Sequence, residues 1–167
     1  MDDIQKLLNR YRNKGILIDT NILLLLIVGS SNRKRISQFK RTEQFVPEDY
    51  DLLIKLVNLF PKIITTPNIL TEVNSLTNQI GEPERSKCFA IFAQLISEIE
   101  EFSLSSQDII KNNDNGFIKF GLTDCGIIEL SKNQYLVLTD DFKLFNYLQK
   151  LGIDSINFNH LRVYLWQ

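Results

Sequence analysis

Short apolar runs alternate with amphipathic stretches along the chain, which is the pattern of an α/β protein. Four of the runs have the length and the β-branched content of buried strands. They cover Gly15–Asp19, Lys62–Thr65, Tyr135–Thr139 and Ile153–Phe158. A helical pattern directly follows each of the first three. We therefore expect parallel strands that are joined by crossover helices.

Helical periodicity fills the intervals between these strands. Helices are predicted over about Asp2–Arg12, Thr20–Val28, Glu48–Leu59, Pro67–Ile80, Pro83–Phe102, Leu122–Lys132 and Asp140–Leu151. Thr66 is a suitable N-cap for the fourth helix, because the missing N–H of Pro67 costs nothing at the first helical position. The helix from Pro83 has an apolar stripe at i, i+3, i+4 and i+7 spacing, which predicts core packing. Right-handed crossovers then give a three-layer α/β/α sandwich with a mostly parallel central sheet.

Length and composition favour one soluble domain over residues 1–167. Hydrophobic residues make up 44% of the 167 residues and charged residues 23%, and no low-complexity linker interrupts them. The most apolar run, Ile22–Val28, is far shorter than the roughly 20 residues that span a bilayer. The start Met1-Asp2-Asp3 lacks the basic region of a signal peptide, and Cys88 and Cys125 form no CxxC pair. We expect a cytoplasmic protein with no membrane segment.

Acidic residues gather where the predicted strands end. Asp19 closes the first strand, and Asp140 and Asp141 follow the third. Glu72 and Asp124 occupy early turns of predicted helices, from which their carboxylates can lean over the same sheet edge. Converging carboxylates raise each other's pKa unless a cation lies between them. Mg²⁺ or Mn²⁺, which prefer hard oxygen ligands, would relieve this repulsion.

Other chemistries lack their characteristic residues. Acids in the first turn of a helix also stabilise its dipole without any catalytic role, and Asp19 is the hardest of the acids to explain in that way. The lone histidine, His160, lies outside the acidic motifs, and the sequence contains no GxSxG, GxGxxG or Walker A pattern. Serine hydrolases, histidine-based ribonucleases, dinucleotide enzymes and P-loop enzymes are therefore disfavoured.

Four short segments together resemble the PIN-domain nucleases. They are Ile18-Asp19-Thr20-Asn21, Thr66-Pro67-Asn68-Ile69-Leu70-Thr71-Glu72-Val73, Thr123-Asp124 and Leu138-Thr139-Asp140-Asp141. Each segment is common alone, and the specificity comes from four acids in this order on these elements. The resemblance covers residues 15–151. It implies a metal-dependent endoribonuclease that hydrolyses RNA phosphodiester bonds with Mg²⁺ or Mn²⁺.

The resemblance also implies a role for each acid. Asp19 matches the family's first acid, Glu72 the helical glutamate, Asp124 the helix-start aspartate and Asp141 the last acid. These four are the expected catalytic residues and metal ligands, and Asp140 is an alternative to Asp141 that could share its role. Asn21 and Thr139 are expected to support the ligands through hydrogen bonds.

The sequence departs from compact family members between residues 29 and 61, which form a longer and more basic insertion. The net charge of −1 gives no overall attraction to nucleic acid, so RNA needs a local basic patch. One segment carries five positive charges and no acid: Arg33, Lys34, Arg35, Lys40 and Arg41. We expect it to bind RNA phosphates, and an ordinary solvated surface is the alternative.

The sequence leaves the biological setting open. It does not decide between a toxin paired with an antitoxin, an RNA-processing enzyme and a defence component. Small bacterial proteins of this resemblance are frequently toxins that dimerise, so a homodimer is expected, and a cognate antitoxin or another protein is a candidate partner. An inactive scaffold that binds RNA or protein is one alternative. An aspartate-nucleophile phosphatase, with Asp19 as nucleophile, is another. Asn21 disfavours the phosphatase, because such enzymes have a second acid at that position.

Overall fold

The computed structural model describes residues 2–132 and 134–165 of the chain. In these residues, five strands form a single parallel sheet in the order β3-β2-β1-β4-β5. The strands are β1 (Ile16–Ile18), β2 (Ile63–Thr65), β3 (Glu100–Glu101), β4 (Leu136–Thr139) and β5 (Ser155–Asn157). Four of them lie inside the predicted apolar runs, and the parallel pairing is as expected.

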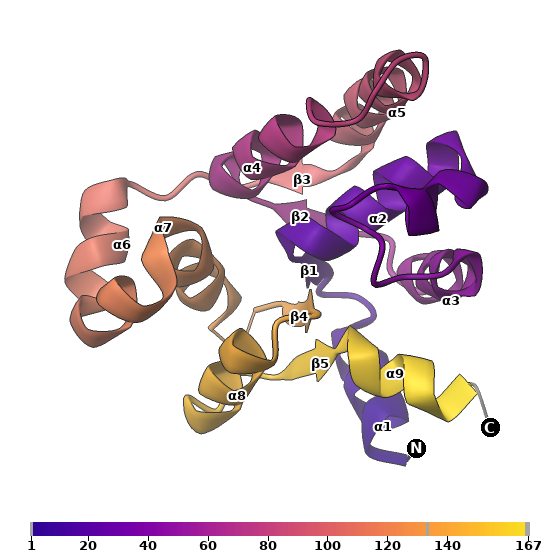
Figure 1. The fold of residues 1–167 in the computed structure, drawn as a ribbon. Helices are drawn as coiled ribbons and strands as arrows, with labels where there is room; N and C mark the ends of the chain where they lie inside the picture. Colours follow the sequence, from indigo (N-terminus) through magenta and orange to yellow (C-terminus); the bar gives the residue numbers. More distant parts are fainter. Residues whose placement is uncertain (1, 133, 166–167) are drawn as a thin grey trace.

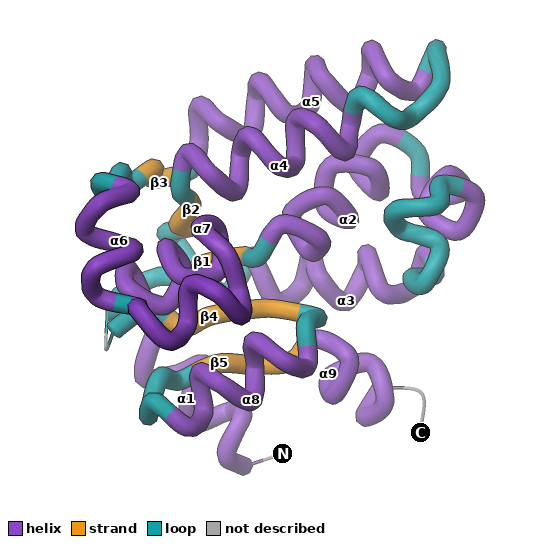
Figure 2. Tube along the Cα trace, turned by 60° about the vertical axis from the view of Figure 1, so that its left-hand side comes forward, coloured by secondary structure: helices purple, strands orange, loops and turns teal. Residues whose placement is uncertain are grey.

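Helices connect these strands and cover both faces of the sheet, as Figures 1 and 2 show. They are α1 (Asp2–Tyr11), α2 (Thr20–Ser31), the 3₁₀ helix η1 (Arg33–Gln38), α3 (Pro47–Val57), α4 (Pro67–Thr77), α5 (Glu84–Glu98), α6 (Ser106–Asn112), α7 (Asp114–Ser131), α8 (Phe142–Lys150) and α9 (Phe158–Leu165). Helices α2 to α5 lie on one side of the sheet, and α7 and α8 lie on the other (Figure 1). The predicted three-layer α/β/α sandwich is confirmed.

Helix α2 is the centre of its layer. Every residue from Ile22 to Val28 is buried, and the helix packs against α3, α4 and α5 as well as β4. A helix that is apolar on all sides needs neighbours on all sides, and these elements supply them. The run Ile22–Val28 is therefore part of the core. No helix in the described part of the chain is long and apolar enough to cross a membrane.

The connections from the sheet diverge between β1 and β4. These two strands pair directly, yet β1 leads into α2 on one face of the sheet and β4 leads into α8 on the other. Their carboxyl ends thus form a topological switch point, which is the usual ligand site of an open parallel sheet. Asp19 and Thr139 lie beside each other at this point, because Ile18 pairs with Leu138.

Several predicted boundaries were wrong. The helix predicted to reach Phe102 ends at Glu98, and Glu100–Glu101 adds an edge strand. The last predicted strand stops at Asn157, and Phe158 already begins α9. The helix predicted from Asp140 begins at Phe142. Helix α6 and the first part of α7 were not predicted at all, and a left-handed Gly121 (φ 78°) separates that part from the predicted helix.

Candidate functional site

Asp19 lies at the carboxyl end of β1 with only 7% of its surface exposed. Its Oδ1 accepts a hydrogen bond from the Thr20 amide (2.7 Å), and its Oδ2 accepts one from the Thr139 hydroxyl (2.6 Å). Burial raises the pKa of Asp19 to about 6, although both hydrogen bonds act to lower it. The charges of Asp140 and Asp141 add to the rise. The carboxylate is therefore held in a fixed orientation, close to other acids.

Two threonine hydroxyl groups hold Glu72 over the same edge of the sheet. The Thr20 hydroxyl donates to Oε2 of Glu72 at 3.0 Å, and the Thr123 hydroxyl donates to Oε1 at 2.5 Å. Thr20 begins α2, Glu72 lies in the second turn of α4, and Thr123 belongs to α7. These two bonds therefore join three separate helices at the glutamate, which itself remains exposed to solvent.

Asp124 is affected by the charges of the other three predicted acids. It lies on α7 and is partly buried, and this burial is the largest cause of a pKa raised to about 7. The negative charges of Asp19, Asp141 and Glu72 raise the pKa further, while the charge of Lys143 lowers it. Three carboxyl groups that are distant from Asp124 in the sequence are thus near enough to raise its pKa. The structure brings together the residues that the sequence predicted.

Asp141 has a clear structural role at this edge. Its Oδ1 caps helix α8 by accepting hydrogen bonds from the amides of Lys143 (2.7 Å) and Leu144 (2.9 Å). Its own amide donates to the Thr139 hydroxyl at 3.0 Å. The capping contribution that acids make at helix starts is therefore present here. Asp141 is nevertheless exposed and acts on the pKa of Asp124, so the cap does not remove it from the acidic group.

Asp140 lies on the Asn21 side of the cluster. Burial raises its pKa, against hydrogen bonds from the side chains of Asn21 and Gln44 that lower it. Asn21 Nδ2 is 3.3 Å from Oδ1 of Asp140. The predicted supporting amide therefore contacts Asp140, while the predicted supporting hydroxyl, Thr139, contacts Asp19. The charge of Asp141 raises the pKa of Asp124, whereas the charge of Asp140 raises the pKa of Asp19 more than that of Asp141 does, so both acids belong to the group.

A divalent cation at this edge would need further ligands besides the carboxylates. Within the described residues, no group of three or more His, Cys, Asp or Glu side chains is placed to hold a metal ion by itself. Mg²⁺ does not require such a cage, because it commonly binds one or two carboxylates together with waters and substrate phosphate oxygens. Asp19 and Asp124 are desolvated beside like charges, an arrangement that a cation would relieve.

The first part of the predicted basic patch lies away from the acids. Arg33, Lys34 and Arg35 belong to η1, which follows the far end of α2 from Asp19, and the 12 residues of α2 span about 18 Å. Arg33 forms an ion pair with Asp51 of α3. Only Lys34 is both exposed and without such a partner among the contacts that the structure describes for these three residues.

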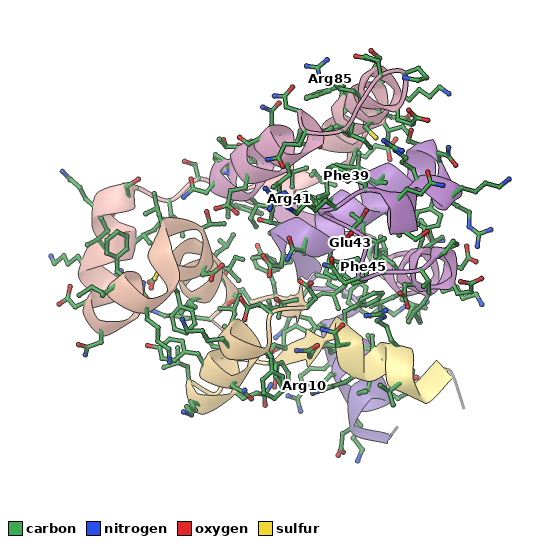
Figure 3. The ribbon with its side chains drawn as sticks, viewed as in Figure 1. Arg10, Phe39, Arg41, Glu43, Phe45 and Arg85 are labelled. Atoms are coloured by element: carbon green, nitrogen blue, oxygen red, sulfur yellow. The ribbon has the colours of Figure 1, made fainter. Side chains whose placement is uncertain are left out.

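The second part of the basic patch lies on the segment that returns from η1 to α3. Figure 3 shows Arg41 and Glu43 along this segment. Lys40 and Arg41 are exposed, and Arg41 Nε donates to the side chain of Gln79 at 2.8 Å. The same segment then reaches Gln44 beside Asp140. The insertion therefore contributes to the site through a neutral side chain that charge patterning did not indicate.

Contacts from α9 hold the segment that contains Gln44. Arg162 of α9 donates to the Gln44 carbonyl oxygen at 2.9 Å and forms an ion pair with the buried Asp49 of α3, also at 2.9 Å. Its guanidinium lies over the Phe45 ring. The C-terminal helix and the insertion are thereby held together next to the acids. No local sequence motif signals this contact, because Arg162 and Gln44 are 118 residues apart.

Lys143 is a cation whose charge acts on Asp124, and sequence analysis missed it. Its charge lowers the pKa of Asp124, and its Nζ donates to the Lys119 carbonyl oxygen at 3.2 Å. The ammonium groups of Lys119 and Lys143 both lie over the Phe120 ring. The only available signal was the position of Lys143 two residues after Asp141. The two lysines are separated in sequence, so no basic run drew attention to them.

Neither the comparison with protein-family models nor the comparison with curated proteins finds a match for this chain. The chemistry of the site must therefore be inferred from its geometry. That geometry is an edge of four acids, fixed by threonine hydroxyls and a helix cap, with one lysine close by.

Proposed function

We propose that this protein is a metal-dependent endoribonuclease of the PIN-domain type, which hydrolyses RNA phosphodiester bonds at the acidic edge between β1 and β4. The observation that carries the proposal is the position of the acids: threonine hydroxyls hold Asp19 and Glu72 at one edge of the sheet, and Asp124 follows one of these threonines. The pKa of Asp124, which burial and the charges of the other acids raise to about 7, agrees with this arrangement. Neighbouring carboxylates repel one another, and a divalent ion would offset this repulsion. Perturbed groups of this kind concentrate at functional sites.

Each acid has a distinct task under this proposal. Asp19, buried and oriented through both oxygens, would be the central metal ligand, with Glu72, Asp124 and Asp141 around it. When bound, Mg²⁺ or Mn²⁺ would lower the pKa of a water molecule and stabilise negative charge on the phosphodiester. In the metal-free protein Asp124 keeps its proton up to near neutral pH. It is thus the acid whose proton must be displaced before the full set of carboxylates is ionised.

The residue at position 21 weighs against the use of Asp19 as a nucleophile. A phosphatase of that kind needs a second acid beside the nucleophile as general acid or base. Asn21 donates its amide to Asp140 and has no acidic group to offer. The geometry therefore suits Asp19 better as a metal ligand than as a nucleophile.

The chemistry of the product ends tests the proposal. Metal-dependent hydrolysis uses water as the nucleophile, so the products should carry hydroxyl and phosphomonoester ends. Cleavage should require Mg²⁺ or Mn²⁺ and stop with a chelator. A ribonuclease that uses the ribose 2′-hydroxyl leaves a 2′,3′-cyclic phosphate instead and needs no metal. Mass spectrometry of the fragments distinguishes the two, and metal-independent cleavage with cyclic ends would contradict the proposal.

Replacing Thr139 with Val should lower RNA cleavage about 10- to 100-fold, the range typical for groups that orient metal ligands. The hydroxyl that donates to Asp19 is lost while the shape of the buried side chain is kept. Thr139→Ser should retain most activity because it keeps the hydroxyl. Initial rates over a range of Mg²⁺ concentrations measure the effect. Equal rates in the Val variant and the wild type would show that the hydroxyl does not position Asp19.

Replacing Lys143 with Gln should reduce the salt dependence of RNA binding. One lost phosphate contact lowers the slope of log K against log salt by about one. Lys34→Gln is the matched control, because it removes an exposed lysine from η1 at the far end of α2. Its slope should stay unchanged. The reverse outcome, with the effect in Lys34→Gln alone, would place the RNA backbone on η1.

We further propose that the protein works in a reducing compartment such as the cytoplasm. Cys88 and Cys125 are both free thiols in buried positions, and burial is the main cause that raises the pKa of each. Thiols in such positions are unreactive and need no oxidising environment. A toxin function with a cognate antitoxin, or a homodimer, would be compatible with the same site.

A further inference from the structure

An aromatic cluster lies directly beside the acidic edge. It consists of Phe142 and Phe145 of α8 and His160 of α9, which we call the aromatic platform. The ring of Phe142 is 6.5 Å from that of Phe145 and 6.2 Å from that of His160, and Phe145 and His160 meet edge to face at 5.4 Å. The neighbouring rings support Phe142 from the side. Phe142 is nevertheless 60% exposed, so most of its surface is open to solvent.

Both helices of the platform also touch the acidic edge. Phe142 directly follows Asp141, the acid that caps α8. On α9, Asn159 precedes His160 and donates its side-chain amide to the Asp140 carbonyl oxygen at 2.9 Å. These two connections place the backbone that carries Phe142 and His160 next to Asp140 and Asp141. Val163, one turn after His160 on the same face of α9, is also 60% exposed.

Cations flank the acids on another side. Lys143 acts on the pKa of Asp124 and contacts Lys119 of α7, so its ammonium lies toward α7, while the adjacent Phe142 ring lies toward α9. Two consecutive residues of α8 thus present an aromatic surface and a positive charge in different directions. Aromatic rings and lysines around a phosphate-binding centre are the combination that proteins use for single-stranded nucleic acid.

We propose that Phe142 is a base-stacking platform that selects single-stranded RNA for the acidic site. This inference rests on the proposed nuclease function and adds a substrate class and a specificity residue to it. A base that is stacked on Phe142 would have its own backbone next to Asp140 and Asp141. A base inside a duplex is already stacked on both faces and cannot offer one to the ring, so paired RNA is not selected.

A protein partner on the platform is a less suitable occupant. An aromatic side chain buries about 150–250 Å² at most, so Phe142 and His160 together offer less than the roughly 800 Å² per partner of a stable interface. One exposed ring matches the size of one base. The adjacent cation Lys143, which attracts phosphate groups, also suits a nucleotide better than an apolar protein face.

RNA binding by cleavage-impaired protein tests this proposal. The full chain carrying Asp19→Asn, with chelator present, is titrated with a labelled single-stranded RNA of mixed sequence and followed by fluorescence anisotropy. Adding Phe142→Ala should raise Kd about 5- to 50-fold, the range for the loss of one stacked base. Phe142→Trp should restore binding, whereas Phe142→Leu, which keeps apolar bulk without an aromatic face, should not. Leu151→Ala is the matched control, since Leu151 is 48% exposed at the other end of the same helix.

Two further ligands distinguish the contribution of base stacking to RNA binding from that of electrostatic attraction. An abasic ribose-phosphate oligomer of the same length should bind equally with and without F142A, and so should a fully paired RNA duplex. Circular dichroism and thermal melting should show an unchanged fold, because Phe142 is exposed. The proposal is overturned if F142A leaves the Kd for single-stranded RNA unchanged, or if the protein binds no RNA in this background.

Sedimentation of the same variants tests whether a second copy of the chain occupies the platform instead of RNA. If F142A changes the oligomeric state and leaves RNA binding unchanged, the platform is a contact between copies of the chain and the stacking proposal fails. Failure of the nuclease proposal is distinguishable from this, because it would appear as wild-type protein that does not cleave RNA with Mg²⁺ or Mn²⁺. If the wild type cleaves RNA and F142A binds single-stranded RNA as well as the protein without this substitution, the stacking proposal fails and the nuclease proposal stands.

Discussion

Asp19→Asn is expected to lower RNA cleavage by more than about 100-fold while leaving the protein folded. Groups that merely orient metal ligands already cost about 10- to 100-fold when removed, and a direct, central ligand should cost more. The substitution keeps the size of the side chain. It removes a charge that is buried and surrounded by Asp140, Asp141 and Asp124, so the acidic repulsion falls. Initial cleavage rates in Mg²⁺ and in Mn²⁺ measure the effect.

The control is Asp108→Asn, another aspartate in the first turn of a helix, which lies exposed on α6. It should cleave RNA at the wild-type rate. Both variants should melt cooperatively. Undiminished cleavage by Asp19→Asn would show that the acids at this edge serve only as helix caps and structural partners. It would favour a scaffold or another active site.

Stability of the metal-free protein should fall as the pH rises from about 4 to about 8, and Asp19→Asn should remove part of this fall. The pKa of Asp19 is raised by burial from 3.8 to about 6. The folded protein therefore binds this proton more tightly than the unfolded chain does. The stabilisation that this provides is complete below the unfolded pKa and is lost as the pH passes through the folded one. For Asp19 it amounts to about 3 kcal/mol, because each tenfold difference in proton affinity corresponds to about 1.4 kcal/mol.

Denaturant unfolding of the wild type and Asp19→Asn at a series of pH values, with chelator present, measures this contribution. The free energy of unfolding of the variant, relative to the wild type, should increase by about 2–3 kcal/mol between acid and alkaline pH. The hydrogen bonds that Asn cannot make affect the variant at every pH and do not change this trend. Parallel curves for the two proteins would contradict the raised pKa of Asp19.

A divalent ion should offset part of the pH trend. Protons and the cation compete for the same carboxylates, so millimolar Mg²⁺ or Mn²⁺ should raise the Tm of the wild type at alkaline pH and have little effect at acid pH. A ligand present at 100 times its Kd stabilises a fold by about 2.7 kcal/mol. Asp124, whose pKa is raised to about 7, makes neutral pH the region of steepest change.

Much of this site was predictable because strand ends are easy to recognise. Asp19 closes an apolar run, and in a parallel sheet every such ending lies at one edge. The Thr66-Pro67 helix start then fixed the turn that carries Glu72. Order along the chain was enough to place the acids at a common edge. It was not enough to reveal that Thr20 and Thr123 hold Glu72 from two sides.

The parts that sequence analysis missed depend on long-range contacts or on weak local patterns. Strand β3 is the pair Glu100–Glu101, which is exposed at the edge of the sheet and has none of the apolar content of a buried strand. Charged residues are favoured on such edges because they discourage pairing with other chains. Helix α6 buries only Ile109 and therefore has no apolar stripe. Gln44 contacts Asp140 from a segment that is bound to the distant Arg162.

Binding of Mn²⁺ tests the central claim most directly, because it requires no knowledge of the RNA target. The wild type and Asp19→Asn are titrated with Mn²⁺ at neutral pH, and the paramagnetic resonance signal of the free ion is recorded. The wild type should deplete the free signal, Mg²⁺ should compete with Mn²⁺ for the site, and Asp19→Asn should leave the signal as it is in buffer. Wild-type protein that leaves the Mn²⁺ signal unchanged at millimolar concentration would contradict the metal-dependent site.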